Sequence, residues 1–140
     1  MDNKYILITI TLFLIIIESI LIIKYNISGF NKKIIYIAIF GQIMVFVAFQ
    51  LENKYLLELS HSLFGITIGC IFLFSKHNFM NYLALFALFV TIVTRKIFNG
   101  CLFLTSTEEC LQILPDNFPA GLLYQSIFLL LLLKCLYYFW

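Results

Sequence analysis

The sequence predicts an all-α integral membrane protein, a polytopic bundle of about five transmembrane helices. The first reason is composition: 63% of the 140 residues are hydrophobic and 11% are charged, whereas an ordinary soluble domain has about 25% charged residues. The second is the presence of five apolar runs, each near the roughly 20 residues that cross about 30 Å of hydrocarbon as a helix. Strands are excluded because an isolated strand leaves backbone groups unpaired in lipid, and the runs lack barrel-like alternation.

The five runs differ in how continuous they are. The third has Glu58 and His61 within its first two turns, and the fourth carries Arg95 and Lys96 near its end. An alternative arrangement therefore has four spans, with the third and fourth runs forming a re-entrant or tilted hairpin. The runs are Tyr5–Ile23, Ile34–Leu51, Tyr55–Phe74, Phe79–Phe98 and Ala120–Trp140.

The longest connector, Asn99–Pro119, has a helix signal of its own. Ser106 and Glu109 have the spacing of a capping box, in which each side chain hydrogen-bonds the backbone of the other. We expect a short interfacial helix over about Thr107–Leu114, ended by Pro115 because proline cannot continue the hydrogen-bond ladder.

Bulk properties narrow the class of partner. No polar stretch is long enough to fold as a second unit, so one transmembrane domain over residues 1–140 is expected. The net charge of +2 comes without a basic run, which argues against nucleic acid and leaves the lipid bilayer and other membrane subunits as partners. Lysine outnumbers arginine eight to one. Such AT-rich usage fits an organellar inner membrane or a viral or host membrane and does not decide between them.

Glu18 is the polar residue that most needs a partner. A carboxylate at mid-span costs about 2.5–3.5 kcal/mol on insertion scales, so it should face protein, be protonated or pair with a cation. With five spans, the first and last helices run in the same direction. Glu18 lies five residues before the end of its run and Lys134 six before the end of its own, which places them within about 2 Å in depth. The sequence therefore predicts a Glu18–Lys134 pair, with Gln42 as a hydrogen-bonding neighbour.

This polar cluster has two interpretations. One is a proton or ion path, and the other is a polar contact that orients helices. The second carries more weight, because one acid and one amine make a poor relay without further ionisable steps.

A second polar set comprises Glu58, His61, Gln50 and Gln125. Glu58 and His61 are three residues apart and share a helix face. Carboxylate-bridged metal sites use the same Glu-x-x-His spacing, but they need it on a second helix as well. One copy is present here, so no metal site is predicted, and we expect these side chains to hydrogen-bond near the headgroups.

Cys101 and Cys110 stand nine residues apart in the longest connector. A disulfide between them is plausible if that connector faces an oxidising compartment. Cys70 and Cys135 lie within apolar runs, where cysteine is usually a small buried hydrophobe.

Gly65 and Gly69 form a Gly-x-x-x-Gly motif in the third run. The motif lets another helix approach closely, and the neighbour could come from the same chain or from a second one.

The function favoured by these features is non-catalytic: an accessory or scaffold subunit of a larger membrane complex, such as an organellar energy-converting complex or a viral membrane layer. No cofactor motif is present. One alternative is a small transporter or an ion- or proton-conducting protein that uses the two polar sets. A further alternative is a membrane enzyme acting on lipid or quinone, with Glu108, Glu109 and Arg95 near the headgroups.

Overall fold

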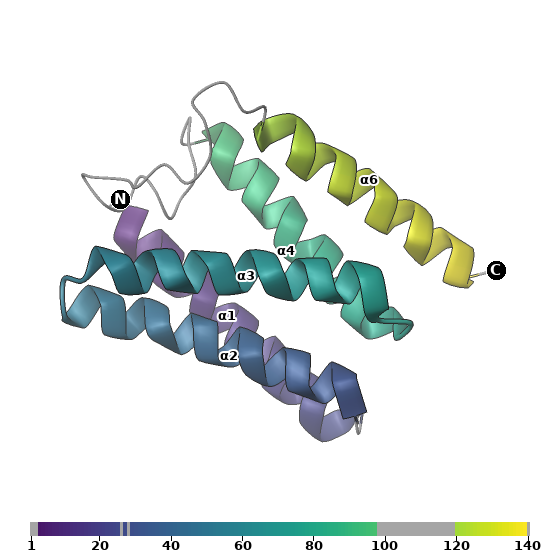
Figure 1. Cartoon of the computed structure of the whole chain (residues 1–140), viewed down its shortest axis with the longest axis horizontal. Helices are drawn as coiled ribbons and strands as arrows, with labels where there is room; N and C mark the ends of the chain where they lie inside the picture. The colour runs from purple at the N-terminus through teal and green to yellow at the C-terminus, as the bar shows by residue number, and fades with distance from the viewer. Residues whose placement is uncertain (1–2, 26, 28, 98–119, 140) are drawn as a thin grey trace.

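Five helices make up the described part of the chain, which covers residues 3–25, 27, 29–97 and 120–139 of a computed structural model (Figure 1). They are α1 (Asn3–Lys24), α2 (Gly29–Gln50), α3 (Lys54–Phe74), α4 (Asn78–Ile97) and α6 (Ala120–Phe139). No strand occurs in these ranges. The predicted all-α helical bundle is therefore confirmed.

Four of the helices, α1 to α4, are long and apolar enough to cross a membrane. No more than 39% of the most apolar window of any of them is buried inside the protein. Most of their surface is therefore available to lipid, as a membrane protein requires. In α6, the apolar stretch identified within the described residues, Gln125–Tyr137, is shorter than the other four.

The largest difference between an observed helix and its predicted run is at the N-terminal end of α2. α2 begins at Gly29, five residues before the predicted Ile34, because the polar first turn with Lys32 and Lys33 continues the same helix. α3 and α4 are continuous helices of 21 and 20 residues, each long enough to cross on its own. The interfacial helix predicted at Thr107–Leu114 lies outside the described residues.

Successive helices pack as antiparallel neighbours, and turns of three residues join α2 to α3 and α3 to α4 (Figure 1). α2 and α3 lie side by side, α1 passes behind them in this view, and α6 lies at the outer edge against α4. One apolar core joins all five helices. Its most buried members are Ile34, Ile35, Ile71, Met80, Ala84, Leu88 and Leu131.

Atoms of the turn between α2 and α3 form hydrogen bonds with backbone groups at the end of α2 and at the start of α3. The Asn53 N–H donates to the Ala48 carbonyl at 2.9 Å, the long-range bond of a Schellman motif, with Glu52 in the left-handed region at φ 50°. The Asn53 side chain then accepts hydrogen bonds from the backbone N–H groups of Tyr55 and Leu56, at 3.0 and 3.3 Å. One residue thus ends α2 and begins α3.

Close contact between α2 and α3 depends on a glycine. A Cβ atom at Gly41 would lie 3.2 Å from the Leu63 Cβ, closer than ordinary van der Waals contact. The Ser60 hydroxyl donates to the Gly41 carbonyl at 2.7 Å, so a hydrogen bond joins the helices at the same point.

The Gly-x-x-x-Gly motif of α3 is not used in this way. A Cβ added at Gly65 or Gly69 would meet no atom within 4 Å in the described structure. The sequence left open whether the helix packed on this motif comes from the same chain or from a second one. Among the described residues, no helix of the same chain approaches this face.

Replacing Asn53 with alanine should lower the free energy of unfolding by about 1 kcal/mol, because two backbone N–H groups of α3 lose their acceptor. Reversible unfolding in mixed detergent micelles, followed by circular dichroism, measures this. Glu52→Gly is the matched control, since glycine adopts the left-handed conformation without strain and should leave the stability unchanged or raise it. An unchanged midpoint for Asn53→Ala would contradict the capping role.

Candidate functional site

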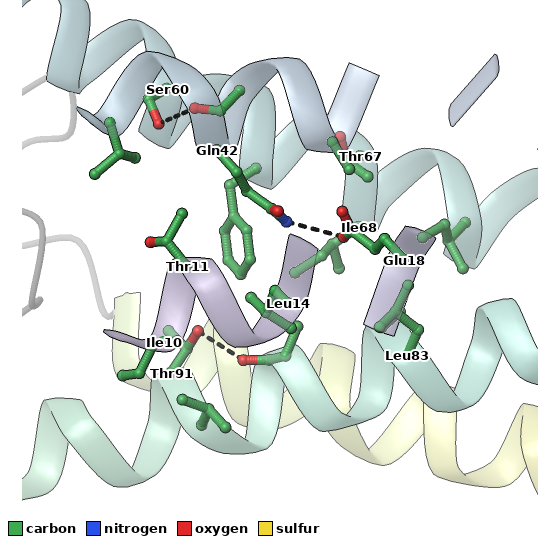
Figure 2. A pocket seen from close by; sticks show the side chains of 18 of the residues that line it. Ile10, Thr11, Leu14, Glu18, Gln42, Ser60, Thr67, Ile68, Leu83 and Thr91 are labelled. Atoms are coloured by element: carbon green, nitrogen blue, oxygen red, sulfur yellow. Dashed lines mark hydrogen bonds between the residues drawn. The ribbon is translucent and has the colours of Figure 1, made fainter. Parts of the chain in front are cut away.

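A cavity of about 90 Å³ lies inside the bundle formed by α1, α2, α3 and α4 (Figure 2). Most of its lining is apolar, but every one of the four helices contributes a polar side chain. These are Thr11, Glu18, Gln42, Ser60, His61, Thr67, Thr91 and Thr94.

Glu18 and Gln42 form the central polar contact of this cavity. The Gln42 side-chain nitrogen donates to Glu18 Oε1 at 2.9 Å, as the dashed line in Figure 2 shows. Both side chains are more than nine-tenths buried, with 4% of Glu18 and 8% of Gln42 exposed. Glu18 Oε2 and Gln42 Oε1 are buried and have no hydrogen-bond partner within the described structure. Each of the two side chains thus has one buried oxygen without a protein partner among the described residues.

The hydroxyl groups that line the cavity already donate their hydrogens to main-chain carbonyls. Thr11 donates to Leu7 at 2.6 Å and Thr67 to Leu63 at 2.7 Å, each one turn back along its own helix. Thr91 and Thr94 do the same in α4, and Ser60 reaches across to α2. A hydroxyl that donates its hydrogen still has lone pairs to accept with. These side chains therefore present acceptors to the cavity.

Lys134, the predicted partner of Glu18, binds elsewhere. Its Nζ donates to the main-chain carbonyls of Ile71 at 3.1 Å and Phe72 at 2.6 Å, and lies 5.8 Å from the centroid of the Phe72 ring. The last four carbonyls of a helix have no intrahelical donor, and the helix dipole makes that end negative. Lys134 thus places a cation from α6 at the C-terminal end of α3.

The difference from the predicted pair has a geometric cause. Depth along a helix follows from chain direction, and Lys134 does lie at the same end of the bundle as the C-terminal part of α1. Lateral position does not follow from chain direction: α6 packs against α4, whereas α1 packs against α2. The carbonyls of α3 are the acceptors that Lys134 reaches, and Gln42 alone of the two expected neighbours contacts Glu18.

The second polar set does not converge on one place. His61 lines the cavity, and Glu58, one turn earlier on α3, is half-buried outside the lining. Gln50 and Gln125 are exposed on α2 and α6. Among the described residues, no group of three or more His, Cys, Asp or Glu side chains could hold a metal ion.

The predicted disulfide between Cys101 and Cys110 lies outside the described residues and stays a prediction. The cysteines within the described helices, Cys70 and Cys135, are free thiols. Cys135 is buried, in keeping with the role of a small hydrophobe.

Sequence reasoning missed the hydroxyl residues and one buried amide. Ser60 and Thr67 are seven residues apart on α3, so their spacing could have placed them on one helix face. Asn81 is fully buried at the start of α4, and neither of its side-chain polar atoms has a partner in the described structure. Single polar residues in an apolar run give no signal of which side they face, which is why these were not identified.

Inference about the function of this protein rests on the geometry of the described site. Comparison with protein-family models, with curated proteins and with solved structures gives no match. What the described site offers chemically is a small internal space with a carboxyl group, an amide and several hydroxyl oxygens.

A double-mutant cycle between Glu18 and Lys134 tests the corrected arrangement. Lys134→Met should lower the free energy of unfolding by about 1–2 kcal/mol, because two charge-assisted hydrogen bonds to α3 are lost. Combined with Glu18→Gln, the two effects should add to within about 0.5 kcal/mol, as they do for residues without shared partners. Reversible unfolding in detergent measures all four proteins, and a coupling free energy well above about 1 kcal/mol would instead indicate a direct pair.

Proposed function

We propose that this protein is a non-catalytic subunit of a larger membrane assembly, bound through the outer face of α3 to a transmembrane helix of another subunit. The observation that carries the proposal is the open space at Gly65 and Gly69. Both positions lack any neighbour within 4 Å among the described residues, although they form the motif that membrane helices use for close packing.

The surroundings of the two glycines fit this role. Gly65 is exposed, and Ile66 and Leu73 on the same outer side of α3 are 58% and 67% exposed. Without side chains at Gly65 and Gly69, a partner backbone can approach while the flanking apolar side chains pack on either side of it. Lipid tails gain less from such a groove than a complementary helix, because van der Waals packing drives association between helices in membranes.

Other features support a structural role. The described turns between α2 and α3 and between α3 and α4 have three residues each, so they leave little room for a site outside the bilayer. α6 packs chiefly against α4, and most of its leucines are exposed. An organellar energy-converting complex or a viral membrane layer is the setting that the AT-rich residue usage suggests, and a Cys101–Cys110 disulfide would fit a connector on an oxidising side.

Replacing both Gly65 and Gly69 with isoleucine should dissociate the partner without unfolding the chain. The added side chains occupy open space in the isolated protein but block close approach of a second backbone. The measurement is the mass and composition of the complex after gentle extraction, by blue native electrophoresis and mass spectrometry. A fixed stoichiometry that is lost in the double variant is the expected result.

Val47→Phe provides the matched control, since it adds volume at an exposed position of α2 and leaves the glycines of α3 unchanged. It should leave the complex intact. An unmodified protein that is monomeric after gentle extraction would contradict the proposal. A symmetric homo-oligomer broken by the glycine substitutions would show that the occupant of this face is a second copy of the chain.

A second candidate function is ion or proton conduction. The observation in its favour is that one cavity touches Glu18 and Gln42 of the first polar set and His61 of the second. The further alternative, an enzyme acting on lipid or quinone, uses Glu108 and Glu109, which lie outside the described residues.

Proton flux into liposomes containing the purified protein separates the two candidates. The subunit proposal expects flux no greater than in empty liposomes, measured with a trapped pH-sensitive dye. Flux that is abolished by Glu18→Gln and kept by Gln50→Leu, an exposed position outside the cavity, would replace the subunit role with conduction.

A further inference from the structure

Four lysines gather at one end of the bundle, where α1 and α3 end and α2 and α4 begin (Figure 1). Lys24 is the last residue of α1, and Lys76 lies in the turn between α3 and α4. Lys32 and Lys33 lie near the start of α2. The Lys32 side chain is half-buried and the other three are exposed. This part of the molecule is called the lysine end below.

Aromatic rings join the two halves of the lysine end into one surface. The Tyr25 ring, directly after α1, lies 4.2 Å between centroids from the Phe79 ring of α4. The Phe30 ring of α2 lies 5.9 Å from the Phe74 ring at the end of α3. Because these contacts connect α1 and α2 with α3 and α4, the lysines of both pairs of helices lie on neighbouring segments.

No carboxylate neutralises these lysines. Residues 19–51 and 59–107, which contain all four, include no Asp or Glu. Glu18, six residues before Lys24, is bonded to Gln42 inside the bundle and is 4% exposed. At the opposite end, four basic residues are accompanied by two acidic ones among the described residues, which leaves +2 (4 − 2) there against +4 for the four lysines. Those residues are Lys4, Lys54, Arg95, Lys96, Glu52 and Glu58.

We propose that the lysine end binds the headgroups of anionic phospholipids in the leaflet around it. An ammonium group forms charge-assisted hydrogen bonds with phosphate oxygens, and lysines close to an anionic membrane surface are attracted to it. A lysine also keeps its alkyl chain on apolar surface while its charge reaches the headgroups. Lys24 Nζ lies 5.6 Å from the centroid of the Tyr25 ring, and Lys32 Nζ lies 5.8 Å from that of Tyr36.

The level of the lysines favours lipid over an acidic segment of another protein. The Tyr25, Phe30, Phe74 and Phe79 rings are between 39% and 64% exposed, and exposed aromatic side chains at the ends of spans are typical of the headgroup layer. The turn that carries Lys76 has only three residues, so it holds this lysine close to the ends of the spans. The inference goes beyond the proposed subunit contact, which uses the glycines of α3, and does not depend on it.

Electron paramagnetic resonance of spin-labelled lipids tests this in phosphatidylcholine bilayers that contain the purified protein. The probes are spin-labelled phosphatidylglycerol and spin-labelled phosphatidylcholine, and the measurement is the fraction of each that is motionally restricted beside the protein. We expect the anionic probe to associate about five-fold more strongly, which is the effect of roughly one lysine near a charged surface. Salt at about 1 M, which shortens the Debye length to about 3 Å, should remove this preference.

Two triple variants locate the preference on the molecule. The first replaces the three exposed lysines of the lysine end with glutamine and should bring the two probes close to equal association. The matched control replaces three lysines of the opposite end, which lowers the net charge by the same amount and should keep most of the preference. The variants are Lys24→Gln/Lys33→Gln/Lys76→Gln and Lys4→Gln/Lys54→Gln/Lys96→Gln.

Equal association of the two probes with the unmodified protein at low salt would overturn the proposal and leave an acidic segment of another subunit as the occupant. An equal loss of preference in both triple variants would also overturn it, because the preference would then follow net charge and not the lysine end. Both measurements use the protein without a partner, so their outcome is separate from that of the glycine variants.

Discussion

Hydrocarbon cannot accept or donate hydrogen bonds, and this constraint determines how each polar group of the bundle is placed. Main-chain groups are satisfied within the helices, and those at the helix ends are satisfied by neighbouring atoms of the chain. Asn53 serves two helices in this way, and Lys134 binds carbonyls at the end of α3. The threonine hydroxyls donate one turn back along their own helices. Each of these contacts removes an unpaired group from the low-dielectric interior.

Glu18 and Gln42 are one place where this internal satisfaction is incomplete, and Asn81 is another. Glu18 and Gln42 bond to each other through one oxygen and one nitrogen, and their two remaining oxygens are buried without a partner in the described structure. The hydroxyls of the cavity lining have already donated their hydrogens to main-chain carbonyls. The same contact that joins α1 to α2 therefore also places a carboxyl group and an amide in the lining of the cavity.

The helices could be predicted from the sequence because long apolar runs have one solution in lipid. Depth could be predicted too, since chain direction and rise per residue place Lys134 at the same end of the bundle as Glu18. Lateral neighbours could not: packing of α6 against α4 depends on side-chain shape, which a hydropathy pattern does not encode. For the same reason Thr11 and Thr67 were not recognised as part of a cavity, whereas Glu18 and Gln42 were identified because a charge or an amide in a span requires a partner.

The contact between Lys134 and α3 has a consequence for biosynthesis. Phe72 and Lys134 are separated by 62 positions in the chain, so the ribosome produces the carbonyl long before it produces the ammonium group. During that interval the Ile71 carbonyl can accept from the Ser75 N–H, at 3.1 Å in the structure, while the Phe72 carbonyl lacks its Lys134 donor. The order of translation therefore places docking of α6 after synthesis of α3, and the Phe72 carbonyl gains its Lys134 donor only once α6 has been made.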